Sequence, residues 1–233
     1  ETIIVPSGKS LTIKKNFTVN NAMINAKNNC SIKGETGSNL VIDGSDTQNT
    51  GGGGGFWAGS SEKSLSIENI TIQHCNAKNG AAIYVSNKVS ATIKNVEIVN
   101  NRSEVSGNEY GRGVGVCNNG GGTVDVINCN IHGNTVLPKN SSTITLHFYG
   151  VGVYCTGSAT TNLTNCKIYD NTFSNSSGHS IICKSAGVFN ESTMTITDCS
   201  ITNNKSLTGS GSGSLTGYGS GIYQNKSGTL SLS

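Results

Sequence analysis

The chain has 233 residues, of which 34% are hydrophobic and only 12% charged, with 31 glycines and a formal net charge of +3. Disordered chains normally carry more charge and fewer β-branched residues, so the composition excludes disorder and indicates a strand-forming, turn-rich protein. The basic residues form no stripe, and no apolar run reaches about 18 residues. We therefore expect no nucleic-acid partner and no membrane span in this chain.

Three short strand signals occupy the N-terminal part, at residues 1–13, 20–34 and 38–44. Glycine, asparagine and serine separate them, and none shows helical periodicity. We expect them to form less regular first turns within residues 1–50. Residue 1 is Glu rather than an initiator Met, which is compatible with a removed export signal.

From residue 51 to residue 233 one unit is written several times. Each copy holds a glycine-led segment and then the pattern φ-x-(Asn/Asp)-φ-x-φ-x-x-Asn, where φ is apolar or Cys. Strand patterns stay constant while the connections change length, which is typical of a solenoid. With the apolar residue of each glycine-led segment as reference, copies lie 27 to 39 residues apart: Phe56, Ile83, Val114, Val153, Val188 and Ile222. The variable loops are residues 102–110, 135–149, 172–185 and 205–218.

A row of polar residues interrupts each strand pattern. In the copy at 91–101, Ile93 and Ile98 have opposite parity, so a straight strand cannot bury both, whereas a bent one can. Asn and Asp tolerate left-handed backbone geometry and suit such a corner. If copies stack about 4.8 Å apart, these side chains form a ladder. The row is Asn69, Asn95, Asn128, Asn165 and Asp198.

A second polar row ends the copies and predicts a second corner: Asn101, Asn134, Asn171 and Asn204. Two inward columns are predicted between the corners, one of Val96, Cys129, Cys166 and Cys199 and one of Ile98, Ile131, Ile168 and Ile201. The outward column is Thr71, Glu97, Asn130, Lys167 and Ser200. Connections between parallel strands are nearly always right-handed. The sequence therefore predicts an all-β, single-domain, right-handed parallel β-helix over residues 1–233, a pectin-lyase-like solenoid with variable loops.

The reactive residues give no clear centre. The eight cysteines show no zinc spacing, the carboxylates form no Asp-Asp or Asp-x-Asp pair, and the histidines do not converge, so we expect no catalytic residue, metal or cofactor. Stacked cysteines are within disulfide reach, yet cysteine also fills apolar columns. Free thiols are expected at Cys129, Cys166 and Cys199. Cys117 and Cys155, near one corner on adjacent rungs, are the candidate disulfide.

The motifs resemble the right-handed β-helix repeat proteins of microbial surfaces. They are similar to the passenger repeats of polymorphic outer-membrane proteins and autotransporters, which carry paired GGAI and FxxN motifs. GAAI at 80–83 matches the first motif, and IVNN, IHGN, IYDN and ITNN match the second with Ile in place of Phe. The resemblance implies a secreted or cell-surface, non-catalytic, adhesive or structural protein. Its partner would be a host or neighbouring cell-surface protein or glycan.

Two other functions stay open at this point. The last repeat stops partway through a rung, which suggests an extracellular filament subunit with head-to-tail self-association, or a fragment of a longer protein. The fold class also admits a polysaccharide-binding or polysaccharide-cleaving enzyme.

Overall fold

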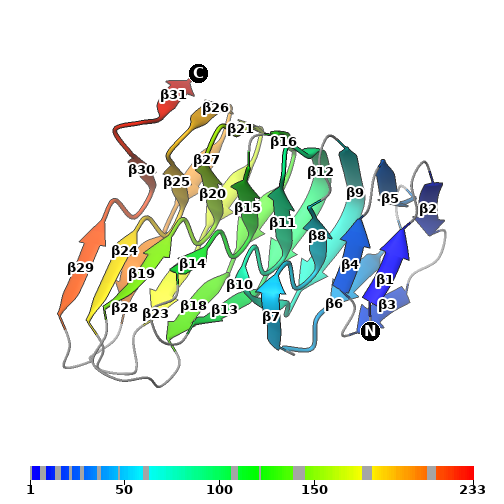
Figure 1. The fold of residues 1–233 in the computed structure, drawn as a ribbon, viewed down its shortest axis with the longest axis horizontal. Helices are drawn as coiled ribbons and strands as arrows, with labels where there is room; N and C mark the ends of the chain where they lie inside the picture. The colour runs from blue at the N-terminus through cyan, green and yellow to red at the C-terminus, as the bar shows by residue number, and fades with distance from the viewer. Residues whose placement is uncertain are drawn as a thin grey trace.

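The computed structural model describes residues 2–5, 9–13, 17–20, 23–26, 29–35, 38–46, 48–59, 63–105, 110–120, 122–138, 145–174, 180–208 and 214–233. Within these ranges the chain forms 31 β strands and no helix, and hence no helix long and apolar enough to cross a membrane. The strands form three parallel sheets that extend side by side along the longest axis of the molecule (Figure 1). This arrangement confirms the predicted all-β parallel coil.

The first sheet contains β1 (Thr2–Val5), β4 (Met23–Ala26), β8 (Phe56–Ala58), β11 (Ile83–Ser86), β15 (Val116–Asn119), β20 (Val153–Thr156), β25 (Val188–Asn190) and β30 (Ile222–Gln224). The second contains β2 (Lys9–Ile13), β3 (Phe17–Asn20), β5 (Cys30–Gly34), β6 (Leu40–Asp43), β9 (Ser64–Gln73), β12 (Ser90–Val99), β16 (Thr123–Ile127), β17 (Asn130–His132), β21 (Thr160–Thr164), β22 (Lys167–Tyr169), β26 (Thr193–Thr197), β27 (Ser200–Thr202) and β31 (Thr229–Leu232). The third contains β7 (Gln48–Gly52), β10 (Asn76–Asn79), β13 (Arg102–Val105), β14 (Tyr110–Arg112), β18 (Thr135–Pro138), β19 (Leu146–Tyr149), β23 (Thr172–Ser174), β24 (Ile181–Lys184), β28 (Lys205–Thr208) and β29 (Leu215–Tyr218).

The second sheet bends where the sequence predicts a corner. Asn95 and Asn128 have φ angles of 53° and 54°, in the left-handed region that Asn tolerates better than most residues. The ten-residue strands β9 and β12 pass through this bend, whereas later turns divide into two strands, such as β16 and β17. The bend lets Ile93 and Ile98 face the same interior, because both are fully buried.

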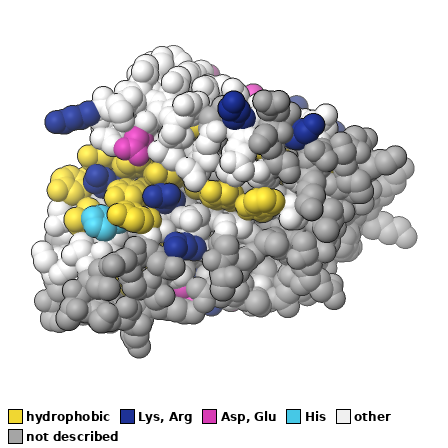
Figure 2. All heavy atoms as spheres, viewed as in Figure 1, with side chains coloured by type: hydrophobic (Ala, Val, Ile, Leu, Met, Phe, Trp, Pro, Cys, Tyr) yellow, Lys and Arg dark blue, Asp and Glu magenta, His cyan; other side chains and the backbone are white. Residues whose placement is uncertain are grey.

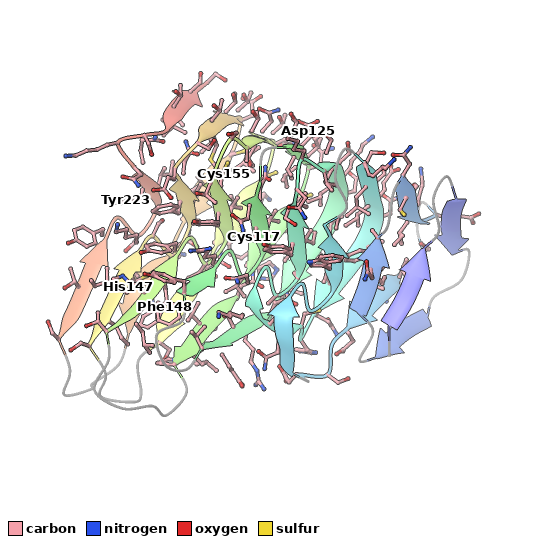
Figure 3. The ribbon with its side chains drawn as sticks, viewed as in Figure 1. Cys117, Asp125, His147, Phe148, Cys155 and Tyr223 are labelled. Carbon is pink, nitrogen blue, oxygen red and sulfur yellow. The ribbon has the colours of Figure 1, made fainter. Side chains whose placement is uncertain are left out.

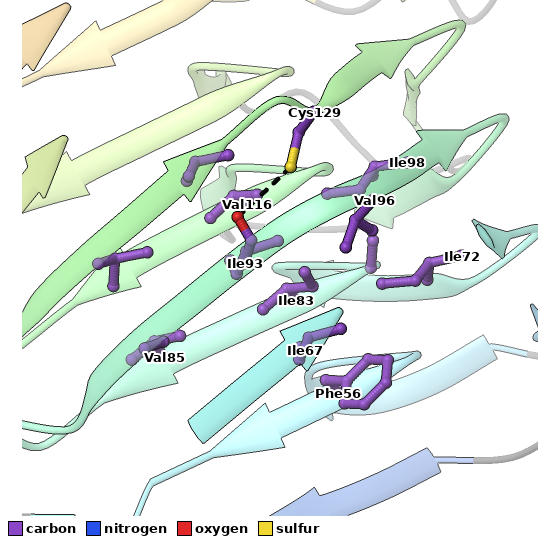
Figure 4. Close-up of a cluster of buried hydrophobic side chains, with 14 of the residues drawn as sticks. Phe56, Ile67, Ile72, Ile83, Val85, Ile93, Val96, Ile98, Val116 and Cys129 are labelled. Atoms are coloured by element: carbon purple, nitrogen blue, oxygen red, sulfur yellow. Dashed lines mark hydrogen bonds between the residues drawn. The ribbon is translucent and has the colours of Figure 1, made fainter. Parts of the chain in front are cut away.

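The main core lies between the first and second sheets. Ile98, Ile131 and Ile168 pair rung to rung, which confirms the predicted isoleucine column. Phe56, Ile83 and Val116 pack against this column from the first sheet (Figure 4). Apolar burial on this scale is the main source of stability in a structure with few ion pairs.

The third sheet was not predicted, and this is a correction. The segments expected to be variable loops contain strands, for example β13 and the start of β14 within 102–110, and β18 and β19 within 135–149. The two halves of this sheet enclose a second core, with Phe148 and Phe173 in contact at a ring-centroid distance of 4.8 Å. Part of the variation in chain length therefore falls between the two strands that one turn contributes to this sheet, such as β13 and β14.

The alignment of one repeat is also corrected. Val116, and not Val114, pairs with Ile83 and Val153. Val114 lies in the second core, whereas Val116 lies in the main core. The two valines have the same parity, so alternation could not distinguish them. The corner residue decides the register, because Gly113 is equivalent to Gly150 and both have positive φ.

Candidate functional site

The first asparagine row forms a ladder on the surface. Asn95 Nδ2 donates to Asn69 Oδ1 (3.0 Å), Asn128 Nδ2 donates to Asn95 Oδ1 (3.3 Å), and Asn165 Nδ2 donates to Asn128 Oδ1 (3.0 Å). Asp198 continues the row with a φ of 52° but has no amide with which to donate. A shallow polar groove of about 360 Å³ follows the ladder. The amides bond to one another, so the row supports the corner.

The second row is a buried ladder: Asn101, Asn134 and Asn171 are completely buried, and Asn204 is almost so. Asn134 Nδ2 donates to the Ile98 carbonyl (3.1 Å) and to Asn171 Oδ1 (2.9 Å). Its Oδ1 accepts from the backbone N–H and the side-chain amide of Asn101, both at 3.0 Å. These four bonds satisfy every polar group of the amide, so the row is structural. The left-handed corner residue precedes each ladder residue, for example Asn100 with φ 53°.

The candidate disulfide between Cys117 and Cys155 is not formed. Cys117 pairs with Tyr154, while Cys155 pairs with Asn118, so the two cysteines are one register position apart. Successive strand residues point to opposite faces, and Cys155 accordingly lies in the main core while Cys117 lies outside it. Both are free thiols, as are the stacked Cys129, Cys166 and Cys199. Figure 3 shows Cys117 and Cys155 on their strands.

Two carboxylate–imidazole pairs lie on the outer face of the second sheet. His74 Nδ1 is 3.1 Å from Asp43 Oδ2, and His132 Nε2 contacts Glu97 Oε1 from the adjacent rung. His132 also stacks on Tyr169 at a centroid distance of 4.5 Å. Each pair has one carboxylate, whereas glycoside hydrolysis normally needs two. Among the described residues, no group of three or more His, Cys, Asp and Glu side chains is placed to hold a metal.

A column of aromatic side chains runs along the outer face of the first sheet. Its members pair rung to rung and point away from the main core: Tyr84, Cys117, Tyr154, Phe189 and Tyr223. Tyr154 and Phe189 stack at 5.2 Å with an interplanar angle of 15°, and Phe189 and Tyr223 stack at 5.4 Å with an angle of 6°. The column is therefore a stack of aromatic rings from Tyr154 to Tyr223, which Cys117 separates from Tyr84.

A second column runs beside it on the third sheet. Arg112, Tyr149, Lys184 and Tyr218 pair in this order on successive rungs. Their side chains meet the first column: Tyr149 lies 5.1 Å from Phe189 and Tyr218 lies 6.0 Å from Tyr223, between ring centroids. We call these two columns, together with Tyr110, whose ring stacks on Tyr149 at 6.1 Å, the aromatic strip. Figure 2 shows a band of hydrophobic side chains on this face, with basic side chains and a histidine among them.

A glycine corner brings the two columns together. Gly80, Gly113 and Gly150 have φ angles of 55°, 52° and 56° between the third and first sheets. A Cβ on Gly150 would lie 2.2 Å from the Val153 carbonyl oxygen and 2.9 Å from Phe189 Cβ. Ser185, with a φ of 68°, takes the equivalent place in the next turn. The positive φ turns the chain sharply, and the outward side chains of both sheets consequently converge.

The strip carries unpaired positive charge. The Arg112 guanidinium lies 5.2 Å from the centroid of Tyr110 and 5.9 Å from that of Tyr154, and Lys184 Nζ lies 5.4 Å from that of Tyr149. Among the described residues, no carboxylate forms a salt bridge with either cation, and Arg112 Nε has no hydrogen-bond partner. Arg112 Nε is itself buried, so a ligand would meet the outer part of the guanidinium and the Lys184 ammonium.

Two ionisable side chains, His147 and Glu191, lie beside the strip. Burial, and then the charge of Lys184, lower the pKa of His147 below its usual range, so its ring is neutral at neutral pH. The Glu191 carboxylate lies nearby, but it accepts hydrogen bonds from the Thr156 hydroxyl (3.1 Å) and the Asn225 amide. The strip therefore presents aromatic faces and two cations.

Sequence reasoning missed this strip. Alignment of Val114 with Val153 shifted one repeat by two residues. Most of the second column lay in segments that were predicted to be loops. A usable signal was nevertheless present: an aromatic residue follows the reference aliphatic residue in IY at 83–84, VY at 153–154, VF at 188–189 and IY at 222–223. Alternation places that following residue outside, where an aromatic row is unusual without a partner.

Comparison with known proteins agrees with the geometry. The searches of curated proteins and of solved structures returned no match. The family model described as a right-handed β-helix region matches residues 54–233, which include most strands of all three sheets. That match covers well over half of the chain, and its handedness is the one expected for connections between parallel strands. The chain therefore belongs to the right-handed β-helix family.

Proposed function

We propose that this chain is a non-catalytic adhesive protein that acts outside the cell, secreted or at a cell surface, and binds a cell-surface glycan or protein through the aromatic strip. The observation that carries the proposal is the length of the strip, which continues over successive rungs along the axis. Tyr110 and Tyr218 on its third-sheet side remain 43% and 45% exposed. Tyr154 and Phe189 are almost completely buried beneath their neighbours, so the accessible part of the strip is formed by Tyr110, Tyr218 and the partly buried rings beside them. Exposed aromatic side chains gathered on one face are characteristic of interaction sites.

The resemblance to passenger repeats of polymorphic outer-membrane proteins supports the surface location. The β-helix family includes enzymes and non-enzymes, so the residues must decide between them. Glu97 and Asp43 each pair with one histidine on different rungs, and among the described residues neither belongs to a group of three or more His, Cys, Asp and Glu side chains that could hold a metal. Binding without turnover is the function that this arrangement favours.

The experiment compares retention with cleavage. The purified chain is passed over immobilised polysaccharides and whole cells, and the soluble fraction is assayed for new reducing ends and unsaturated sugars. We expect retention without product release. The double variant Tyr110→Ser/Tyr218→Ser should weaken retention at least tenfold, because it removes exposed stacking surface with little loss of core packing.

Tyr169→Ser is the matched control, since Tyr169 lies on the outer face of the second sheet. It should retain wild-type binding. Release of sugar products would show an enzyme instead, and equal retention by the wild type and the double variant would show that the strip is not the binding surface.

A further inference from the structure

The cations of the strip occur at alternate rungs. Arg112 is followed by Tyr149, Lys184 and Tyr218 on consecutive rungs of the third sheet. With rungs about 4.8 Å apart, the two cations are separated by two steps, or roughly 10 Å. The intervening positions are aromatic. The order along the axis is therefore cation, aromatic, cation, aromatic.

From this order we infer that the strip binds an extended acidic glycan in which an acidic sugar alternates with a neutral one, with the polymer lying along the axis. This inference rests on the proposed function and deepens it by naming the ligand chemistry. Acidic groups would contact Arg112 and Lys184, and the neutral sugars would stack on Tyr149 and Tyr218.

The charge pattern favours alternation over a polymer in which every sugar is acidic. An aromatic face carries negative electrostatic potential, which attracts cations and repels a carboxylate or sulfate placed over it. If every sugar were acidic, half of the anionic groups would lie over Tyr149 and Tyr218 without a cation. They would lose water without gaining a counter-charge.

The surroundings of these two cations differ from those of the paired cations elsewhere. Lys33 and Lys94 contact Glu68, at 2.8 and 4.0 Å, and Arg102 contacts Asp46 and Glu104. In the described structure, Arg112 and Lys184 instead lie against tyrosine rings. An anionic ligand would supply a counter-charge to these two cations, whereas an uncharged glycan or an apolar peptide would bury them without one.

The test uses three soluble probes and titration calorimetry. A hyaluronan oligosaccharide alternates glucuronate with a neutral sugar, an oligogalacturonate is acidic at every sugar, and a cello-oligosaccharide is neutral. We expect the alternating probe to bind at least tenfold more tightly than either of the others. Its affinity should fall as salt is raised, because the contacts are exposed to screening ions.

Charge variants assign the contacts. Arg112→Gln and Lys184→Gln should each lower affinity for the hyaluronan probe at least fivefold, while Arg112→Lys should retain most of it. Lys167→Gln is the control: Lys167 is an exposed lysine on the second sheet, so its loss changes net charge equally without touching the strip. Far-UV circular dichroism verifies that each variant is folded.

The outcomes separate this inference from the proposed function. Equal binding of the neutral probe, or unchanged affinity in both Gln variants, would overturn the acidic ligand while leaving a glycan-binding strip. Equal binding of the oligogalacturonate would overturn alternation. Cell retention that survives glycosidase but not protease would identify a protein partner and also overturn the inference. If the double variant Tyr110→Ser/Tyr218→Ser were retained as well as the wild type, the proposed function itself would be rejected.

Discussion

Asparagine has two different tasks in this protein, and burial separates them. In the surface row, Asn128 adopts a left-handed backbone and its amide bonds to its neighbours near water. In the buried row, Asn134 keeps a four-bond network inside the coil, where the bonding groups cannot turn to solvent. The same residue type thus stabilises a conformation in one row and satisfies buried polar groups in the other.

The two tasks predict different costs of substitution. Asn134→Ala removes the side-chain acceptor of the buried Asn101 backbone N–H and the side-chain donor to the Ile98 carbonyl, and it breaks the ladder on both sides, so the free energy of unfolding should fall by about 3 kcal/mol or more. Asn128→Gly preserves the left-handed corner and removes only exposed bonds, so the fall should be less than about 1 kcal/mol. Urea unfolding followed by circular dichroism measures both. Equal losses would contradict the division.

At the scale of elements, the corners decide the shape. The asparagine corner bends the second sheet around the main core, whereas the glycine corner turns the chain from the third sheet into the first. The glycine corner is concave toward solvent, which brings Tyr149 against Tyr154 and Phe189. The strip is therefore a consequence of positive-φ backbone geometry at a corner that holds glycine in most turns and Ser185 in one.

Two glycines with positive φ provide a matched test of this corner. Gly150→Ala forces a Cβ to within 2.2 Å of the Val153 carbonyl oxygen, so we expect a loss of about 3 kcal/mol or more. Gly157 has a φ of 74°, but the nearest atoms to an added Cβ are 3.8 Å away, so Gly157→Ala should cost only about 1 kcal/mol. The midpoints of urea unfolding of the two variants measure this difference in stability. A Gly150→Ala protein as stable as Gly157→Ala would refute the close-approach argument.

At the scale of the whole molecule, the columns of identical residues were predictable and the lateral sheet was not. The isoleucine and asparagine columns repeat at matched positions, and stacking in register follows from that repetition. The third sheet consists of strands such as β14, whose three residues include a glycine and show no alternation of apolar side chains. Its inward residue is that glycine, Gly111, which fits against Phe148 from the next turn, a contact visible only in three dimensions.

The candidate site was lost for a related reason. Tyr154 and Lys184 belong to different sheets and different repeats, and only the concave corner brings them to one surface. The candidate disulfide failed through a register error of one residue, which moves a side chain to the opposite face. Spacing alone could not detect either effect, because both depend on the positive φ of corner residues such as Gly113.

In the folded coil, the buried cysteines should react slowly with alkylating reagents. Burial raises the pKa of Cys155 to about 11 and those of Cys75 and Cys183 to about 12, so their reactive thiolates are scarce at pH 8. A hydrogen bond with Cys129 lowers the pKa of Cys166 to about 7, but Cys166 is buried away from reagents. Cys199 is the cysteine that the structure leaves partly exposed. Iodoacetamide at pH 8 should modify Cys199 on the order of tenfold faster than any other thiol in the folded protein.

Mass spectrometry of the alkylated protein checks this expectation. Cys199→Ser should remove the adduct formed under native conditions, and urea should expose all remaining thiols. A peptide pair joined through Cys117 and Cys155 would contradict the observed register.

The alternation of inward and outward side chains along each strand also determines how the strip could become longer. Inward residues such as Val153 fill the coil, and the outward neighbour Tyr154 belongs to the strip, so one short strand serves both purposes. A duplicated turn would insert a further pair of contact residues without altering those already present. Because each added contact engages the same polymer, avidity would increase with the number of turns.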